Sequence, residues 1–192
     1  MRHSYMRKFR ALVYYILLIK FILIILTIPQ KSFSQEPAGE EKDESMESRH
    51  FISLSFGYTF IPKGGNLEST EATGFFVPSI GLDYFYRIKP RWEIGTMMDV
   101  ELDHYLIIDK DLERENAFIA TVVGLYKISP HLSIFAGGGI EVEHHKNLAV
   151  FRAGIDSPIS LGRGWVLAPT LIFDFKEGYD TWSLAIAIGK EF

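Results

Sequence analysis

The sequence contains no cysteine among its 192 residues. Disulfide bonds, zinc–thiolate sites and a cysteine nucleophile are therefore excluded, and so is a lipoprotein anchor, which needs a cysteine after the export signal. A basic excess is also missing, because the formal net charge is −4, so no cationic surface favours a nucleic-acid partner. With 47% hydrophobic residues the chain is too apolar for a disordered protein, and its length suits one domain.

The first 34 residues have the order of a secretory signal peptide. The first ten carry four basic residues and no acid, an apolar run follows from Ala11 to Pro29, and Ser32-Phe33-Ser34 places small residues where a signal peptidase reads them. We expect cleavage after Ser34. An uncleaved membrane helix is the alternative, because a run of roughly 18 apolar residues is long enough to span a bilayer. The small residues at the cleavage site and the acidic segment after it favour cleavage.

Residues 35–48 form an acidic segment without an aromatic residue. It holds six acidic side chains and Lys42 as its one basic residue. Such a composition cannot bury enough apolar surface to offset the conformational entropy lost on folding. We therefore expect a disordered periplasmic linker, rather than a partner-binding segment, before a domain that spans residues 49–192.

From residue 49 onward the hydrophobic pattern has a period of two. Ile52, Leu54 and Phe56 alternate with Ser53 and Ser55, which is typical of a strand with one apolar face. Similar segments follow, so that eight are found at 52–60, 79–88, 92–103, 117–128, 132–143, 151–156, 165–176 and 182–192. An even number of segments, each near the roughly 9–11 residues that cross a bilayer, predicts an all-β fold, namely an eight-stranded antiparallel up-and-down transmembrane β-barrel.

Two prolines interrupt this pattern. Pro78 and Pro169 stand within predicted strands, although proline cannot donate a hydrogen bond to a sheet ladder. They indicate bulges or strand ends at these positions.

The chemistry of the two faces separates a membrane barrel from a soluble one. A soluble barrel turns its apolar face inward, whereas a barrel in lipid turns that face outward and encloses its charges. Aromatic residues gather near the strand ends, as at membrane interfaces. We therefore expect the charged face to form a polar network in the lumen, to which Lys176 would add a cation. Its expected members are Asp83, Arg87, Glu93, Asp99, Glu101, Asp103, Glu141, Glu143, Arg152, Asp156 and Asp174.

The last segment, Ser183 to Phe192, alternates strictly and ends in an aromatic residue. It resembles the C-terminal signal by which bacterial outer-membrane proteins are recognised for insertion. Residues 49–192 resemble the small outer-membrane barrels of the OmpX and OmpA-domain type. The resemblance implies a location in the outer membrane, contact with outer-membrane lipid and lipopolysaccharide, and recognition by the outer-membrane assembly machinery through Phe192.

The same resemblance implies periplasmic termini. The short turns at 89–90, 129–131 and 157–164 would then face the periplasm. The connections at 63–72, 109–115, 144–147 and 176–180 would face outward.

Motifs that carry chemistry are weak in this sequence, and we predict no catalytic residue, no cofactor and no metal site. His144 and His145 are adjacent, so on a strand they would point to opposite faces, and a surface loop is the better interpretation than a zinc site. His131-Leu132-Ser133 has the spacing of a lipid A deacylase motif, but it lies at the expected periplasmic end and Ser133 points inward.

We therefore expect a non-enzymatic barrel with a packed polar lumen and a structural or interaction role in the cell envelope. Two alternatives stay open. One is a narrow pore or cation-binding barrel, and the other is a lipid A modifying enzyme.

Overall fold

In a computed structural model of the protein, residues 48–68, 71–72, 74–144 and 146–192 are described. The expected signal peptide lies outside these residues, as does the expected linker except for Ser48. Among the described residues no helix is long and apolar enough to cross a membrane.

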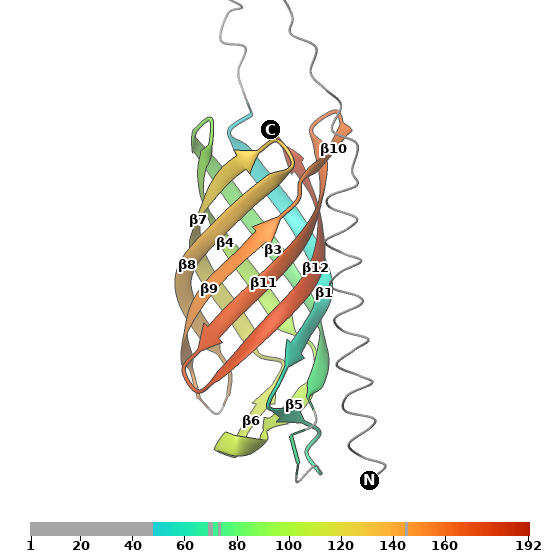
Figure 1. Cartoon of the computed structure of the whole chain (residues 1–192), viewed down its shortest axis with the longest axis vertical. Helices are drawn as coiled ribbons and strands as arrows, with labels where there is room; N and C mark the ends of the chain where they lie inside the picture. Colours follow the sequence, from blue (N-terminus) through green and yellow to red (C-terminus); the bar gives the residue numbers. More distant parts are fainter. Residues whose placement is uncertain (1–47, 69–70, 73, 145) are drawn as a thin grey trace, which may run out of the picture. The chain divides into compact units, whose positions relative to one another are not determined.

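Eight long strands close into one antiparallel barrel (Figure 1). Each pairs with the next long strand in the chain, and the last pairs with the first from Phe51↔Glu191 to Phe60↔Trp182. The eight strands therefore leave no open edge between them, and the expected eight-stranded fold is confirmed. The strands are β1 (His50–Ile61), β3 (Phe75–Lys89), β4 (Trp92–Glu101), β7 (Phe118–Ser129), β8 (Leu132–Val142), β9 (Leu148–Asp156), β11 (Trp165–Lys176) and β12 (Tyr179–Glu191).

Short elements lie at the two ends of the barrel. At one end, which we call the loop end, β2 (Gly64–Gly65), β5 (His104–Ile107) and β6 (Leu112–Glu115) form a second sheet. A 3-10 turn, Ile108–Lys110, joins β5 to β6. At the opposite end, where β1 begins and β12 ends, β10 (Ile159–Gly162) pairs with β11. We call this the turn end.

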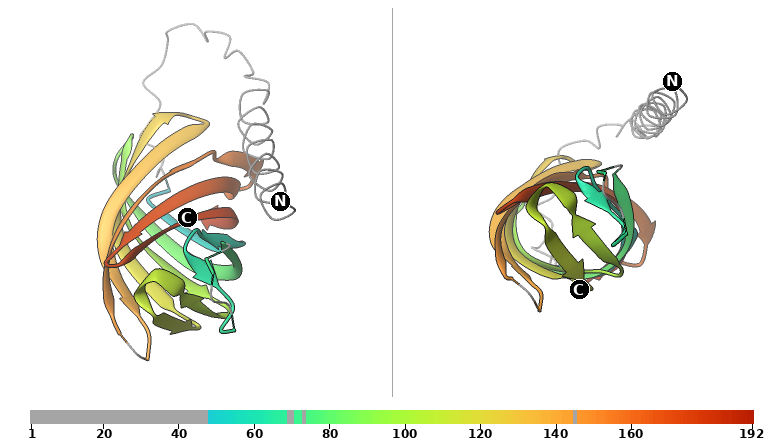
Figure 2. Two further views of the ribbon diagram at one scale, coloured as in Figure 1. Left: turned by 60° about the horizontal axis from the view of Figure 1, so that its bottom comes forward. Right: turned by 90° about the horizontal axis from the view of Figure 1, so that it is seen from below.

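The connection between β4 and β7 differs from the expectation. The sequence predicted a strand through residue 103 and then an outward charged loop at 109–115. Instead β4 ends at Glu101, and the hairpin β5–β6 lies across the mouth of the barrel at the loop end (Figure 2). The reason is burial of apolar surface, because Tyr105 and Ile107 of the hairpin pack with Ile61, Val77, Leu148 and Tyr179 into one cluster.

The side chains of each barrel strand alternate between lipid-facing and interior positions. In β1, Leu54 and Phe56 are 47% and 53% exposed, while Ser53 and Ser55, which alternate with them, are buried. The apolar face of the barrel is thus the outer one, as the sequence predicted. The other long strands repeat this arrangement on the outside with Ile80, Leu82, Ile94, Val122, Ile134, Ile140, Phe151, Phe173, Leu184, Ile186 and Ile188.

The prediction of bulges or strand ends at the two prolines was wrong, because β3 and β11 run through them. The carbonyl of Pro78 accepts from the N–H of Leu102 (2.8 Å), and the carbonyl of Pro169 accepts from the N–H of Ser157 (3.0 Å). In an antiparallel strand the N and O of one residue face the same neighbour. Each missing N–H therefore faces a residue just beyond the end of β4 or of β9, where no regular ladder continues.

Candidate functional site

The interior of the barrel holds a layer of charged side chains near the loop end. Arg152 of β9 is buried, and its guanidinium donates to both carboxylate oxygens of Asp174 at 2.7 and 2.8 Å. The same guanidinium is ion-paired to Asp99 of β4. The planar fork of arginine suits this two-bond contact with a carboxylate, so Arg152 connects three strands of the wall through the interior.

A second cation, Lys176 of β11, joins opposite walls. Its Nζ is 2.8 Å from a carboxylate oxygen of Glu101 on β4 and 2.8 Å from one of Glu141 on β8. Strands β11 and β4 are four strands apart in either direction around the barrel. Tyr105 donates a hydrogen bond to Glu101, and Tyr179 donates one to Glu141 at 2.9 Å. The ion pair between Lys176 and Glu101 therefore crosses the lumen.

The third cation enters from the hairpin at the loop end. Arg114 of β6 has no exposed surface. Its Nε lies 2.9 Å from Glu141, while its Nη1 donates to Glu143 at 3.1 Å and to the carbonyl of Lys146 at 2.5 Å. Because these acceptors lie on β8 and just after it, Arg114 fixes the hairpin to the barrel wall.

The interior is apolar nearer the turn end, so the expected packed polar lumen also contains an apolar layer. Six interior side chains from five strands pack into one cluster with Phe51 beside it. The sequence pattern does not reveal this layer on β7, because Val122 on the outside and Val123 on the inside are both apolar. Alternation therefore cannot tell the two faces apart there. The cluster consists of Phe85, Met97, Val123, Leu125, Phe135 and Ile172.

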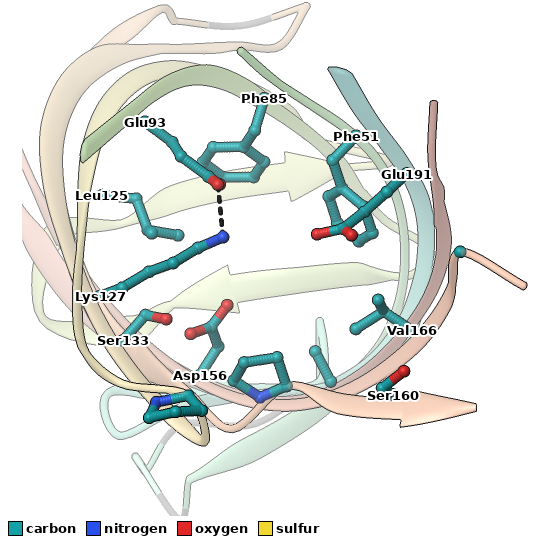
Figure 3. A pocket seen from close by; sticks show the side chains of 14 residues that line it. Phe51, Phe85, Glu93, Leu125, Lys127, Ser133, Asp156, Ser160, Val166 and Glu191 are labelled. Atoms are coloured by element: carbon teal, nitrogen blue, oxygen red, sulfur yellow. Dashed lines mark ion pairs between the residues drawn. The ribbon is translucent and has the colours of Figure 1, made fainter. Parts of the chain in front are cut away.

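A cavity of about 240 Å³, which we call the turn-end pocket, opens beyond the apolar cluster (Figure 3). Phe51, Phe85 and Leu125 form part of its lining. Near it, Glu93 lies 2.6 Å from Lys127 and 3.1 Å from Arg87. Arg87 also lies 3.0 Å from Glu191. The turn-end pocket thus combines an apolar part with a ring of charged groups.

The expected lumen residues divide between these regions. Arg87 and Asp156 are partly buried at the turn end. Asp103 lies beyond the end of β4, where its carboxylate accepts the N–H of His104 at 2.8 Å, so it belongs to the hairpin connection. Eight others are buried in the interior, namely Asp83, Glu93, Asp99, Glu101, Glu141, Glu143, Arg152 and Asp174.

Several interior groups were missed by the sequence analysis. Arg114 belongs to a segment interpreted as loop, Tyr105 lies between that loop and the strand predicted to end at residue 103, and Tyr179 belongs to a segment interpreted as a connection. One signal pointed to Arg114, since the acidic side chains of the charged face outnumbered its cations. That excess is consistent with a further cation from outside the eight predicted strands.

An exposed ion pair stands at the loop end, outside the membrane-spanning strands. Lys63 Nζ lies 2.6 Å from Asp109 of the hairpin. The hydrogen bond from Lys63 holds the pKa of Asp109 below its ordinary value, and the same bond raises the pKa of Lys63. On the hairpin itself, His104 of β5 is hydrogen-bonded to Glu113 of β6. The contact between Lys63 and Asp109 attaches the hairpin to the β1–β3 connection.

The histidine and serine residues considered for metal binding or catalysis are not brought together into one site in the described residues. In the described part of the chain no group of three or more histidine and acidic side chains could hold a metal ion. His144 is exposed at the loop end, and His145 is outside the described residues. His131 is exposed in a turn, whereas Ser133 is buried and hydrogen-bonded to Asp156.

Aromatic rings border the apolar exterior at both ends. Near the loop end Phe60 contacts Phe76 and Trp182, with ring centroids 4.8 and 5.2 Å apart. At the turn end Trp92 and Tyr126 are 4.8 Å apart. An apolar outer surface between aromatic girdles, around a closed and charged interior, defines a transmembrane β-barrel, the class that spans bacterial outer membranes. The protein is an eight-stranded transmembrane β-barrel.

Solved structures of small outer-membrane barrels are similar in fold. The attachment invasion locus protein Ail of Yersinia pestis has 11% identity and a TM-score of 0.47, over 75% of this chain and 99% of that one. The N-terminal barrel of Pseudomonas aeruginosa OprF has 11% identity and a TM-score of 0.45, over 76% and 98%. Neisserial surface protein A has 8% identity and a TM-score of 0.46, over 74% and 97%. No protein-family model and no curated protein matches the sequence.

Proposed function

We propose that the protein is a sealed, non-enzymatic barrel with a structural or interaction role in the envelope. The observation that carries the proposal is the ion pair between Lys176 and Glu101, which joins opposite walls across the lumen. The hairpin β5–β6 covers the loop end, and the apolar cluster fills the level below the charged layer. A solute would have to displace all three.

The energy of the charged layer supports a closed lumen. An opening that separates Lys176 from Glu101 would leave a buried carboxylate without this cation, and a buried charge without its partner is strongly unfavourable. A cavity lined by Asp99, Glu101 and Arg152 has about 10 Å³, close to the space of a single water.

A narrow cation path is the second candidate, and one observation favours it. Among the described residues, the charged layer holds six acidic side chains but only the cations Arg114, Arg152 and Lys176. A negative interior would admit cations in preference to anions. Its acidic members are Asp83, Asp99, Glu101, Glu141, Glu143 and Asp174.

Single-channel recording in planar bilayers separates the two candidates. We expect no steady conductance from the wild-type barrel, or from a variant in which residues 104–115 are replaced by a short Gly-Ser linker. Adding Lys176→Ala and Arg152→Ala to that variant, together with Phe85→Ala and Phe135→Ala in the apolar cluster, should open a small cation-selective leak. Lys190→Ala on the exposed end of β12 is the matched control and should stay silent. A steady cation-selective current through the wild type would refute the sealed barrel.

The non-enzymatic part of the proposal has its own test. We expect mass spectra of lipid A to be the same from cells with and without the protein. A change in the number or length of acyl chains that depends on expression would support the lipid A modifying alternative instead.

The proposal also includes an orientation and partners. We propose that the turn end faces the periplasm, that the apolar exterior contacts outer-membrane lipid and lipopolysaccharide, and that the assembly machinery recognises β12 and Phe192. The support for recognition at Phe192 is geometric, because its ring is stacked 5.6 Å from that of His50 at the closing β1–β12 seam. Labelling of a single cysteine placed at Asn66, or at Arg163, from outside intact cells would check the orientation.

A further inference from the structure

The turn-end pocket is shaped for a small ligand. Its volume of about 240 Å³ exceeds the roughly 150 Å³ of an engineered apolar cavity that admits benzene. Phe51, Phe85 and Leu125 offer one apolar wall, and Val166 and Ala168 line the pocket from β11. An aromatic ring with a two- or three-atom polar arm would fit this space.

Some charged groups around the pocket have ion-pair partners, whereas one carboxylate oxygen has no hydrogen-bond partner among the described residues. Lys127 is engaged by Glu93 at 2.6 Å, and Arg87 is shared between Glu93 and Glu191. Asp156 differs from these groups, because its Oδ1 is buried and has no hydrogen-bond partner among the described residues. Its carboxylate faces into the pocket (Figure 3). A buried acceptor without a partner costs free energy that a bound donor can recover.

The geometry points to a binding site for a small amphiphilic cation. We propose that a primary ammonium group donates to Asp156 while a compact apolar body packs against Phe51, Phe85 and Leu125. Of the three lining carboxylates, Glu93 and Glu191 are paired with Lys127 and Arg87, so the carboxylate of Asp156 remains for a ligand and favours a cation over an anion. The sheltered position strengthens the charge-assisted hydrogen bond, and the two phenyl rings can contact the cation or its apolar body.

Binding of phenethylammonium to the folded barrel in an uncharged maltoside detergent tests the proposal. Its neutral isostere 2-phenylethanol and the anion 3-phenylpropionate are the comparison probes. We expect saturable amide shifts in NMR spectra at residues 51, 85, 125 and 156 with phenethylammonium, and affinities at least about tenfold weaker for the other two probes. Equal binding of the three probes, or shifts confined to the loop end, would overturn the proposal.

Two variants locate the site. Asp156→Asn keeps the shape of the side chain but removes its charge, and should weaken phenethylammonium binding about tenfold or more. Asp180→Asn, the same change at the opposite end, should leave it unaltered. Ala168→Leu fills part of the pocket and should abolish binding of all probes. Heat-modifiable gel migration confirms folding, and an unchanged affinity in both Asp156→Asn and Ala168→Leu would contradict the site.

Discussion

Replacement of Arg152 by methionine tests whether the charged layer holds the barrel together. Methionine keeps most of the length of the arginine side chain but offers no charge and no donor. Asp174, which receives two hydrogen bonds from Arg152, and Asp99, which is ion-paired to it, would both stay buried without that cation. The lipid-facing surface is untouched by the change, so any loss of stability comes from the interior.

The expected loss in the free energy of unfolding is about 3–5 kcal/mol, as for other buried ion pairs that lose one partner. Removing the charge of Asp174 as well should restore part of it. In the double variant Arg152→Met/Asp174→Asn we expect a coupling free energy of about 1–3 kcal/mol between the two sites. A value near zero would mean that Asp174 does not depend on Arg152.

Urea unfolding of the barrel in phospholipid vesicles, followed by fluorescence of its tryptophans, measures these values. Trp92, Trp165 and Trp182 lie in the barrel wall and report on its exposure to water. Arg91→Met, the same substitution in an exposed turn, is the control and should change stability by less than about 0.5 kcal/mol. If Arg152→Met lies within about 1 kcal/mol of the wild type, the ion pairs described here do not stabilise the fold as reasoned.

Three further predictions concern other parts of the barrel. A Cβ at Gly137 would overlap the backbone of strand β7, whereas at Gly138 the nearest atom would be 3.7 Å away. Gly137→Ala should therefore cost about 1–3 kcal/mol in the same urea assay, and Gly138→Ala little, and equal effects would contradict the close strand contact. At the loop end, the lowered pKa of Asp109 and the raised pKa of Lys63 mean that their ion pair holds from mildly acidic to mildly alkaline pH. It should be lost as pH falls through the pKa of Asp109 or rises through that of Lys63, and in a carboxyl NMR titration Lys63→Met should return the pKa of Asp109 to its ordinary value. Phe192→Ala should slow insertion by reconstituted assembly machinery, seen as less of the heat-modifiable band, and a wild-type rate would show that the ring is not the recognised feature.

The barrel could be predicted because its two environments change at every residue. Leu54 faces lipid and Ser55 faces the interior, and the same contrast marks β12 at Leu184 and Ala185. The signal weakens where the interior is itself apolar, as at Val123 on β7. There both faces have the same character, so alternation does not separate inside from outside.

The hairpin at the loop end could not be predicted from local pattern. Arg114 is buried through contacts with Glu141 and Glu143, and the latter stands 29 residues later in the chain. Its burial depends on the closure of the barrel and on the register of β8, neither of which is encoded in residues 104–115. The turn-end pocket could not be predicted for the same reason. Phe51 and Asp156 both line it, but they come together only when the barrel has closed.

Because the first and last strands pair with each other, the closed wall of the barrel does not depend on which strand begins the chain and which ends it. His50 and Phe192 exchange both backbone hydrogen bonds, at 3.0 and 2.9 Å. Joining Phe192 to Arg49 through a short Gly-Ser linker and reopening the chain in the turn between β7 and β8 would give a circular permutant with every pairing of the wall intact. Its last strand would end at Ser129 in place of an aromatic residue. The permutant would therefore separate two requirements: a complete barrel that is stable in a membrane, and a C-terminal aromatic residue for recognition during assembly.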